Sequence, residues 1–124
     1  MQEREVVIWH NPRCSKSRQG LAFLGEHGIE PRIVRYLEDP PDEAELERVL
    51  DLLGMKPRQL MRRKEKIYRQ LGLDDENLSR NRLIRAMVEN PKLIERPVVI
   101  AGDRAVLGRP PEAVLEIIAA EGAS

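Results

Sequence analysis

The only cysteine of this chain, Cys14, stands in a stretch that is rich in cations. Arg13, Lys16 and Arg18 lie within four residues of it, and His10 precedes it by four. The thiolate is the reactive form of cysteine, and nearby cations or a helix N-terminus lower the pKa of a thiol. An inert buried cysteine would instead have apolar neighbours. The surroundings of Cys14 therefore indicate a nucleophilic thiolate.

Three arginines stand where they could bind a substrate anion. Arg62 lies in a basic run of three residues, and Arg96 and Arg109 each directly precede a proline. A guanidinium stays charged and offers a planar fork of donors that suits tetrahedral oxyanions. Because a thiolate repels an oxyanion, several cations would be needed to bring the two together. The alternative for each arginine is a solvated surface charge, and it is strongest for Arg62, since two more cations follow it.

The polar residues around Cys14 each allow two interpretations. His10 could donate a proton or a hydrogen bond to the sulfur and favour the thiolate, or it could only cap the turn. Asn11 and Ser17 are candidate hydrogen-bond donors to the sulfur or to a bound anion, although Ser17 could equally be an ordinary early residue of the helix. Pro97 is a candidate cis-proline, because the expected fold places it opposite the thiol just before a strand.

Several familiar motifs are absent from the sequence. Ser17 stands where a dithiol oxidoreductase has its second cysteine, so the chain cannot close a disulfide of its own. Arg18 follows the cysteine by four positions rather than by the six of a Cys-x5-Arg phosphatase loop, and there is no GxxxxGK[ST] phosphate loop. A single cysteine also excludes metal sites built on several of them, and we expect neither a bound metal nor a bound cofactor.

Composition limits the class of protein further. The 21 basic and 21 acidic residues cancel, which argues against a nucleic-acid surface. No apolar run approaches the roughly 20 residues of a membrane span, and the charged N-terminus is not typical of a signal peptide. We therefore expect a single domain covering residues 1–124, a cytoplasmic location, and no nucleic-acid or membrane partner.

The elements that must position Cys14 begin with a strand at residues 6–9, where four apolar residues precede the loop. A helix is expected from about residue 15 to Gly28. Cys14 then lies at or near the helix N-terminus, where unpaired N–H groups and the helix dipole stabilise an anion. A second short strand is expected within residues 29–36.

An all-helical insertion is expected at approximately residues 42–90. Asp42 and Glu45 predict a capping box, and Gly54 ends the helix that follows it. The two further helical pieces of the insertion are expected at residues 56–66 and 79–90, the second capped by Ser79.

A hairpin of two strands, at residues 96–100 and 105–107, follows the insertion. A last helix begins near Pro110, with Val114, Leu115 and Ile118 on one face. The order of elements predicts an α/β fold, a thioredoxin-like domain with a mixed four-stranded sheet and an inserted helical subdomain.

Five blocks of sequence, in the same order between about residues 6 and 118, resemble the glutaredoxin-coupled arsenate reductases of the ArsC type. These blocks are residues 10–18, 36–41, 60–64, 95–99 and 108–111. The resemblance implies that Cys14 is the nucleophile, that His10 helps to lower its pKa, and that a cis peptide precedes Pro97. It also implies that the arsenic oxyanion is held by Arg62, Arg96 and Arg109.

The resemblance further implies a reaction and its partners. The thiolate attacks arsenate and expels water or hydroxide, glutathione attacks the adduct, and glutaredoxin then removes the glutathione. Arsenic is left as As(III) on the cysteine, and hydrolysis releases arsenite. The implied partners are arsenate, glutathione as co-substrate, and glutaredoxin. The chain departs from the family at Ser15 and Lys16, where members from arsenic-resistance operons often carry Gly-Thr.

Two other functions stay open at the level of sequence. One is a non-catalytic regulatory module akin to the Spx-type proteins, which share the fold and bind RNA polymerase but commonly carry a Cys-x-x-Cys switch that is absent here. The other is a thiol-dependent reductase acting on another oxyanion or on a glutathione mixed disulfide.

Overall fold

The chain forms two compact units in the computed structural model, which describes residues 5–117. Unit 1 takes in the chain up to Asp39 and again from Arg96, and unit 2 comprises Pro40–Glu95. The expectation of a single domain, with a helical insertion at approximately residues 42–90, stays a prediction.

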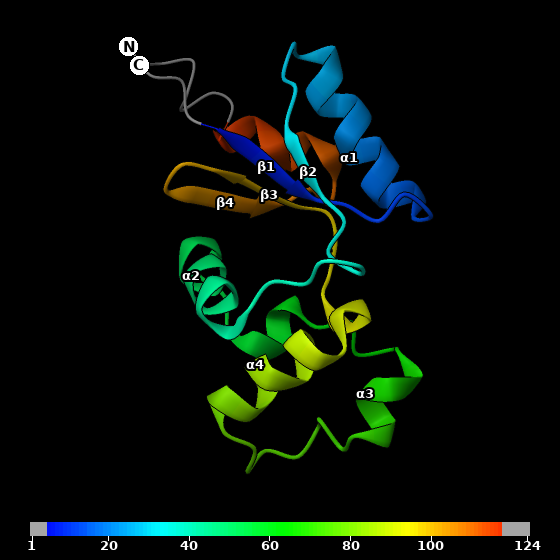
Figure 1. Ribbon diagram of the computed structural model, residues 1–124, viewed down its shortest axis with the longest axis vertical. Coiled ribbons are helices and arrows are strands. Elements are labelled where there is room, and N and C mark those ends of the chain that lie inside the picture. Colours follow the sequence, from blue (N-terminus) through cyan, green and yellow to red (C-terminus); the bar gives the residue numbers. More distant parts are fainter. Residues whose placement is uncertain (1–4, 118–124) are drawn as a thin grey trace. The chain divides into compact units, whose positions relative to one another are not determined.

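Unit 1 contains a four-stranded sheet of order β2-β1-β3-β4 (Figure 1). β1 (Val6–Trp9) pairs in parallel with β2 (Arg32–Val34) and antiparallel with β3 (Val98–Ala101). β3 pairs antiparallel with β4 (Arg104–Leu107). The mixed four-stranded sheet predicted from the sequence is confirmed.

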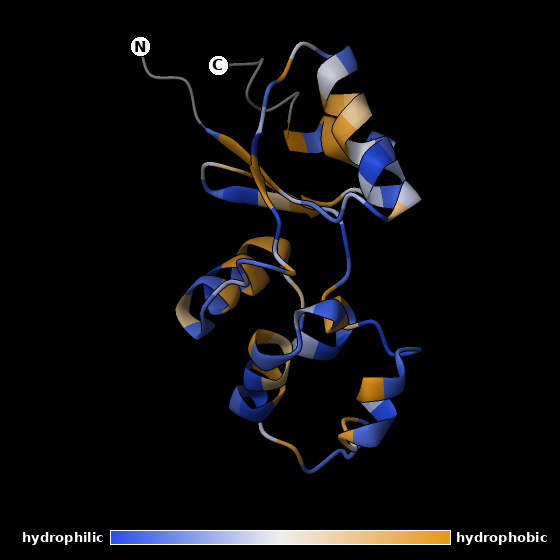
Figure 2. Ribbon diagram, turned by 45° about the vertical axis from the view of Figure 1, so that its right-hand side comes forward, coloured by the Kyte–Doolittle hydropathy of each residue, from blue (hydrophilic) through white to orange (hydrophobic). Residues whose placement is uncertain are grey.

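One face of this sheet is covered by α1 (Ser15–Glu26) and by the 3-10 turn η3 (Pro111–Val114), as Figure 1 shows. β1 is apolar along its length (Figure 2), which suits a strand at the centre of a sheet. The buried core of this layer consists of Ile8, Leu24, Val99, Ala101, Val114 and Ile117. Leu24 is the α1 residue of this core, so these side chains pack the second half of α1 against the sheet.

The last helix begins differently from the prediction. Residues 111–114 form a 3-10 turn, and only residues 115–117 continue as α-helix within the described chain. Short 3-10 turns are frequent at helix N-termini, and the successive prolines Pro110 and Pro111 supply no N–H groups. Ile118, expected on the apolar face, lies outside the described residues.

Unit 2 is helical. Its longer helices, α2 (Glu43–Leu53) and α4 (Arg80–Glu89), agree closely with the predicted ones. Gly54, with φ of 66°, ends α2 in the left-handed conformation that glycine adopts readily. The buried residues of the two helices recur at helical spacing and are Leu46, Val49, Leu50, Leu83, Ile84, Ala86 and Met87.

The helical piece predicted at residues 56–66 is wrong over most of its length. A 3-10 turn, η1 (Pro57–Leu60), is followed by an isolated bridge between Met61 and Ile94. The next helix, α3 (Lys66–Gln70), begins only at the predicted end. A second 3-10 turn, η2 (Pro91–Leu93), links α4 to this bridge.

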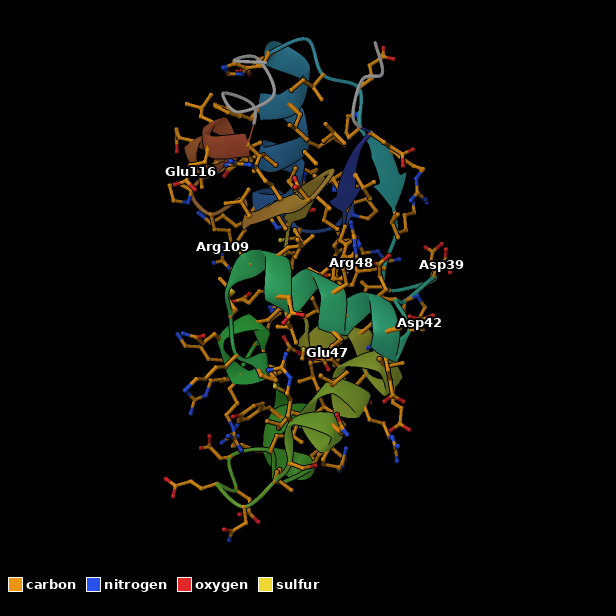
Figure 3. All side chains as sticks on the ribbon, turned by 90° about the vertical axis from the view of Figure 1, so that its left-hand side faces the viewer. Asp39, Asp42, Glu47, Arg48, Arg109 and Glu116 are labelled. Atoms are coloured by element: carbon orange, nitrogen blue, oxygen red, sulfur yellow. The ribbon has the colours of Figure 1, made fainter. Side chains whose placement is uncertain are left out.

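The capping box expected at the start of α2, where Figure 3 labels Asp42, is only half formed. The Asp42 carboxylate accepts a hydrogen bond from the Glu45 N–H at 2.8 Å. The Glu45 carboxylate pairs instead with Arg48, at 3.1 Å. Asp42 therefore caps the helix without the reciprocal bond.

Among the described residues, no helix is long and apolar enough to cross a membrane. The same residues contain no group of three or more His, Cys, Asp and Glu side chains that could hold a metal ion.

Candidate active site

Cys14 is the N-cap residue of α1, with an extended backbone (φ −99°, ψ 123°). Its N–H donates to the Asn11 carbonyl at 3.0 Å, and its own carbonyl accepts the N–H of Arg18 at 3.0 Å. The side chain is partly exposed. The sulfur therefore lies where the first N–H groups of a helix have no helical partner, which is a favourable place for an anion.

The thiol has a lowered pKa, and the causes lie in its immediate contacts. Partial burial raises the pKa of Cys14, but the backbone N–H of Ser17, the side chain of Arg96 and the backbone N–H of Lys16 outweigh it and bring the pKa below its ordinary value. The Arg96 Nε–H donates to the Cys14 sulfur at 3.2 Å and also acts through its charge. This combination increases the fraction of Cys14 that is ionised at neutral pH.

His10 and Ser17 form a buried polar pair that is hydrogen-bonded to the cysteine loop. The Ser17 hydroxyl accepts the Asn11 N–H at 2.9 Å and lies 2.6 Å from Nδ1 of His10. Burial, followed by the charges of Arg35 and Arg18, lowers the pKa of His10, so its ring is neutral near pH 7. Because a buried hydroxyl proton needs an acceptor, we assign the Ser17 O–H as donor to His10 Nδ1.

The structure shows the partners of two of the candidate side chains. The Nδ1 atom of His10 is hydrogen-bonded to the Ser17 hydroxyl, whereas the sequence left open whether the ring would bond to the sulfur or cap the turn. Ser17 acts on Cys14 through its backbone N–H, since its hydroxyl is turned to His10 and Asn11. The catalytic part of His10 and the anion-binding part of Ser17 stay predictions.

The side chain of Asn11 is hydrogen-bonded within the cysteine loop. Its side-chain oxygen accepts the N–H of Arg13 at 3.0 Å, and the Arg18 guanidinium donates to the Pro12 carbonyl at 2.9 Å. Such Asx turns are common where Asn precedes a proline, and that signal was present in the sequence. A donor role of the Asn11 amide toward a bound anion stays a prediction.

Arg109 is exposed at the exit of β4 (Figure 3). The preceding residue, Gly108, donates its N–H to the Pro97 carbonyl at 2.9 Å, which joins the hairpin exit to the segment carrying Arg96. The Arg96–Pro97 peptide bond is cis, in agreement with the candidate cis-proline. The Arg109–Pro110 bond is also cis, and no feature of the sequence predicted it.

Arg62 belongs to unit 2. Its guanidinium lies 3.0 Å from the Glu65 carboxylate, and the neighbouring Arg63 is paired with Asp74 at 2.8 Å. The structure therefore brings Arg96 to the sulfur of Cys14, and the part played by Arg62 stays a prediction.

The fold and the site together define a class of protein. A mixed four-stranded sheet carries, between its first strand and first helix, one partly exposed cysteine with a lowered pKa. This is a thioredoxin-like protein whose site is built around a single cysteine of lowered pKa.

Comparison with known proteins identifies the family. The sequence model of the ArsC family matches residues 9–117, and the chain belongs to this family. It is 56% identical to "Uncharacterized protein YfgD" of Escherichia coli K12, over 93% of this chain and 98% of that protein. It is 49% identical to "Arsenate reductase" of Haemophilus influenzae, over 91% and 98%. The solved structure "Arsenate reductase from Vibrio cholerae" superposes with a TM-score of 0.90 at 50% identity, covering 94% of this chain and 99% of that one.

Proposed function

We propose that this protein reduces arsenate to arsenite, with Cys14 as the nucleophile and with glutathione and glutaredoxin as the source of electrons. The observation that carries the proposal is the Arg96 Nε–H at 3.2 Å from the sulfur of a cysteine whose pKa is lowered. Membership of the ArsC family supports arsenate as the substrate, since relatives of 45–49% identity are named arsenate reductase.

The proposed reaction begins with attack of the Cys14 thiolate on As(V). A sulfur–arsenic bond forms and an arsenic–oxygen bond breaks, releasing water or hydroxide. The glutathione thiol then displaces a second oxygen. A glutaredoxin thiolate attacks the glutathione sulfur, so that a mixed disulfide forms and the electron pair of the arsenic–sulfur bond stays on arsenic as As(III). Hydrolysis releases arsenite and restores the thiol.

Each site residue has a proposed role in this scheme. Arg96 stabilises the thiolate and then donates to the bound oxyanion, for which its planar donors are suited. Arg109 and Arg62 contribute further charge to oxyanion binding, as the resemblance implies. The Ser17 N–H stabilises the sulfur, and His10 holds Ser17 in place through the hydroxyl. The Asn11 amide is a further candidate donor to the oxyanion.

The proposed co-substrates agree with the cysteine content. The whole sequence has one cysteine, so no second thiol of the chain can supply electrons. Glutathione and glutaredoxin are cytosolic reductants, and we therefore propose a cytoplasmic location. No resident cofactor takes part in the scheme.

The test is a glutaredoxin-coupled assay of arsenite formation. Cys14→Ser should abolish turnover, because serine is not ionised at neutral pH. Arg96→Ala and Arg62→Ala should raise the KM for arsenate about tenfold, the cost of one lost charged hydrogen bond. Arg63→Ala is the matched control for Arg62, since its guanidinium is already bound to Asp74.

Two results would reject the proposal. One is full activity of Cys14→Ser. The other is wild-type protein that forms no arsenite from saturating arsenate with matched glutaredoxin. In the second case, reduction of a glutathione mixed disulfide or recovery of RNA polymerase subunits in a pull-down would point to the alternatives raised by the sequence.

A further inference from the structure

Two glycines lie against the ring of Pro97. A Cβ atom on Gly20 of α1 would stand 2.8 Å from Pro97 Cγ, which is closer than real Cβ contacts. A Cβ atom on Gly108 would stand 3.0 Å from the same Cγ atom and 3.5 Å from Val114 Cγ2. Gly20, Gly108 and Pro97 are all buried. The proline ring thus occupies space that exists only because both neighbours lack a side chain.

Backbone conformation does not explain either glycine. The described glycines with positive φ are Gly28, Gly54, Gly72 and Gly102. Gly20 lies inside a helix, where glycine is less stable than alanine. The close approach of Pro97 is therefore the physical reason for glycine at residue 20, and by the same contact at residue 108.

We propose that Gly20 and Gly108 are positioning residues, which seat Pro97 so that the preceding residue, Arg96, holds its Nε–H at the sulfur of Cys14. The inference deepens the proposed function, since it assigns the placement of the arginine on which that function rests. The test measures the ionisation of the Cys14 thiol directly and does not require arsenate turnover.

Gly20 is connected to Arg96 through the ring of Pro97, and this ring has little freedom to move. The Cγ atom of Pro97 belongs to a ring closed onto the backbone nitrogen, so it cannot move aside like the end of a flexible side chain. Pro97 is also fixed on its other side, because its carbonyl accepts the Gly108 N–H at 2.9 Å and β3 begins at the next residue. A methyl group on Gly20 must therefore displace the Arg96–Pro97 segment or the start of α1, which carries Cys14. Either movement disturbs the 3.2 Å contact between Arg96 Nε and the sulfur.

The experiment is the pH profile of Cys14 alkylation by iodoacetamide. In Gly20→Ala, the midpoint should move to higher pH, and the rate near pH 6 should fall about threefold or more as the thiolate fraction falls. The plateau rate at high pH should not fall, because the thiol keeps its access and a thiolate of higher pKa is the stronger nucleophile. In Gly108→Ala, the midpoint should also rise but by less, since the contact of its Cβ atom with Pro97 is longer.

Gly25→Ala is the matched control. It makes the same substitution in the same helix, but a Cβ atom there meets nothing within 4 Å. Its midpoint should equal that of the wild type. Arg96→Ala should raise the midpoint by itself, and adding Gly20→Ala to it should cause no further change if the glycine acts through the arginine.

Other outcomes would overturn the inference. If the folded glycine variants alter the melting temperature or the plateau rate but not the midpoint, the glycines serve packing alone. A further rise of the midpoint on adding Gly20→Ala to Arg96→Ala would show an action that bypasses the arginine. If Gly20→Ala does not fold, the milder variant Gly108→Ala is used to test the proposal. An unchanged alkylation midpoint in Gly108→Ala then rejects it. Failure of arsenate turnover with the expected midpoints would reject only the proposed function.

Discussion

At the scale of single residues, the unusual feature is a neutral, buried histidine next to the loop of a cysteine whose pKa is lowered. His10 is only 6% exposed, and its ring nitrogen is hydrogen-bonded to the Ser17 hydroxyl. Protonation would turn the accepting nitrogen into a donor, so the Ser17 hydroxyl proton would lose its acceptor, and it would add a charge near Arg35 and Arg18. The loop of Cys14 therefore depends on His10 staying neutral.

This pair predicts a pH dependence of stability. The pKa of His10 is lower in the folded chain than in the unfolded one, where it is about 6.5. Below that pH the unfolded chain binds the proton more readily, so the free energy of unfolding falls by up to about 1.4 kcal/mol per pH unit until the folded value is reached. His10→Asn keeps an acceptor for Ser17 and removes the titration. Its urea unfolding should vary less between about pH 7.5 and 5.5 than that of the wild type.

The exposed His27 provides the comparison for this prediction. His27→Asn should keep the pH dependence of the wild type. An identical pH dependence in His10→Asn and wild type would show that His10 is not the titrating group.

The sequence identifies a cysteine whose pKa is lowered, but not the charged side chain that contacts its sulfur. The cations nearest in the chain suggested the cause of the low pKa, yet the guanidinium that contacts the sulfur is Arg96, 82 residues away. Arg18 is instead bound to the Pro12 carbonyl, and Lys16 contributes through its backbone N–H. Proximity along the chain does not determine where a long flexible side chain is directed, and only the sheet brings Arg96 to Cys14.

At the scale of elements, helix ends decide where the chain turns. α1 begins at the cysteine itself, whose side chain faces the first N–H groups as a thiolate would. α2 begins at Asp42, whose carboxylate satisfies the Glu45 N–H. The two helix starts use the same kind of unpaired N–H donors, which lower the pKa of the thiol in α1 and bond to a carboxylate in α2.

The cap of α2 predicts a measurable loss of stability. Asp42→Ala should lower the free energy of unfolding by about 1 kcal/mol, because the N–H of Glu45 loses its acceptor. Asp42→Asn should retain most of the stability, since Asn is as good an N-cap. Asp39→Ala changes the net charge equally at an exposed position outside the helix and should have little effect. Chemical denaturation followed by circular dichroism measures all three, and equal losses in Asp42→Ala and Asp39→Ala would attribute the effect to charge alone.

The elements that the sequence predicts well are those with local signals. The expected bounds are close to the observed ones for β1, α1, α2 and α4. Apolar periodicity, N-caps and the glycines that end helices each depend on residues that are close in the sequence. The helix predicted at residues 56–66 does not form, because the backbone hydrogen bonds of this segment go to residues that are distant in the sequence. The Arg62 N–H donates to the Leu93 carbonyl, and the Glu95 N–H donates to the Leu60 carbonyl, so a distant segment replaces the helical partners.

At the scale of the whole molecule, unit 1 is assembled from both ends of the chain. β1 and α1 come from the first part, whereas β3, β4 and Arg96 come from the part after Pro40–Glu95. The contact between Arg96 and Cys14 therefore exists only when the sheet has formed. The lowered pKa of the thiol is a property of the folded unit and not of the cysteine loop alone.

The whole chain has one thiol, and this fixes the electron balance of the proposed reaction. Reduction of As(V) to As(III) takes two electrons, which in the proposed scheme come from the thiols of glutathione and glutaredoxin. After many turnovers, thiol titration should still find about one free thiol per chain, and each arsenite should be matched by one mixed disulfide between glutathione and glutaredoxin. With glutathione but no glutaredoxin, arsenite formation should stall, and mass spectrometry should find arsenic bound at Cys14. The same rate without glutaredoxin would contradict this order of electron transfer. Accumulation of glutathione on Cys14 would show instead that the thiolate attacks glutathione disulfides, because only then does the protein sulfur itself become oxidised.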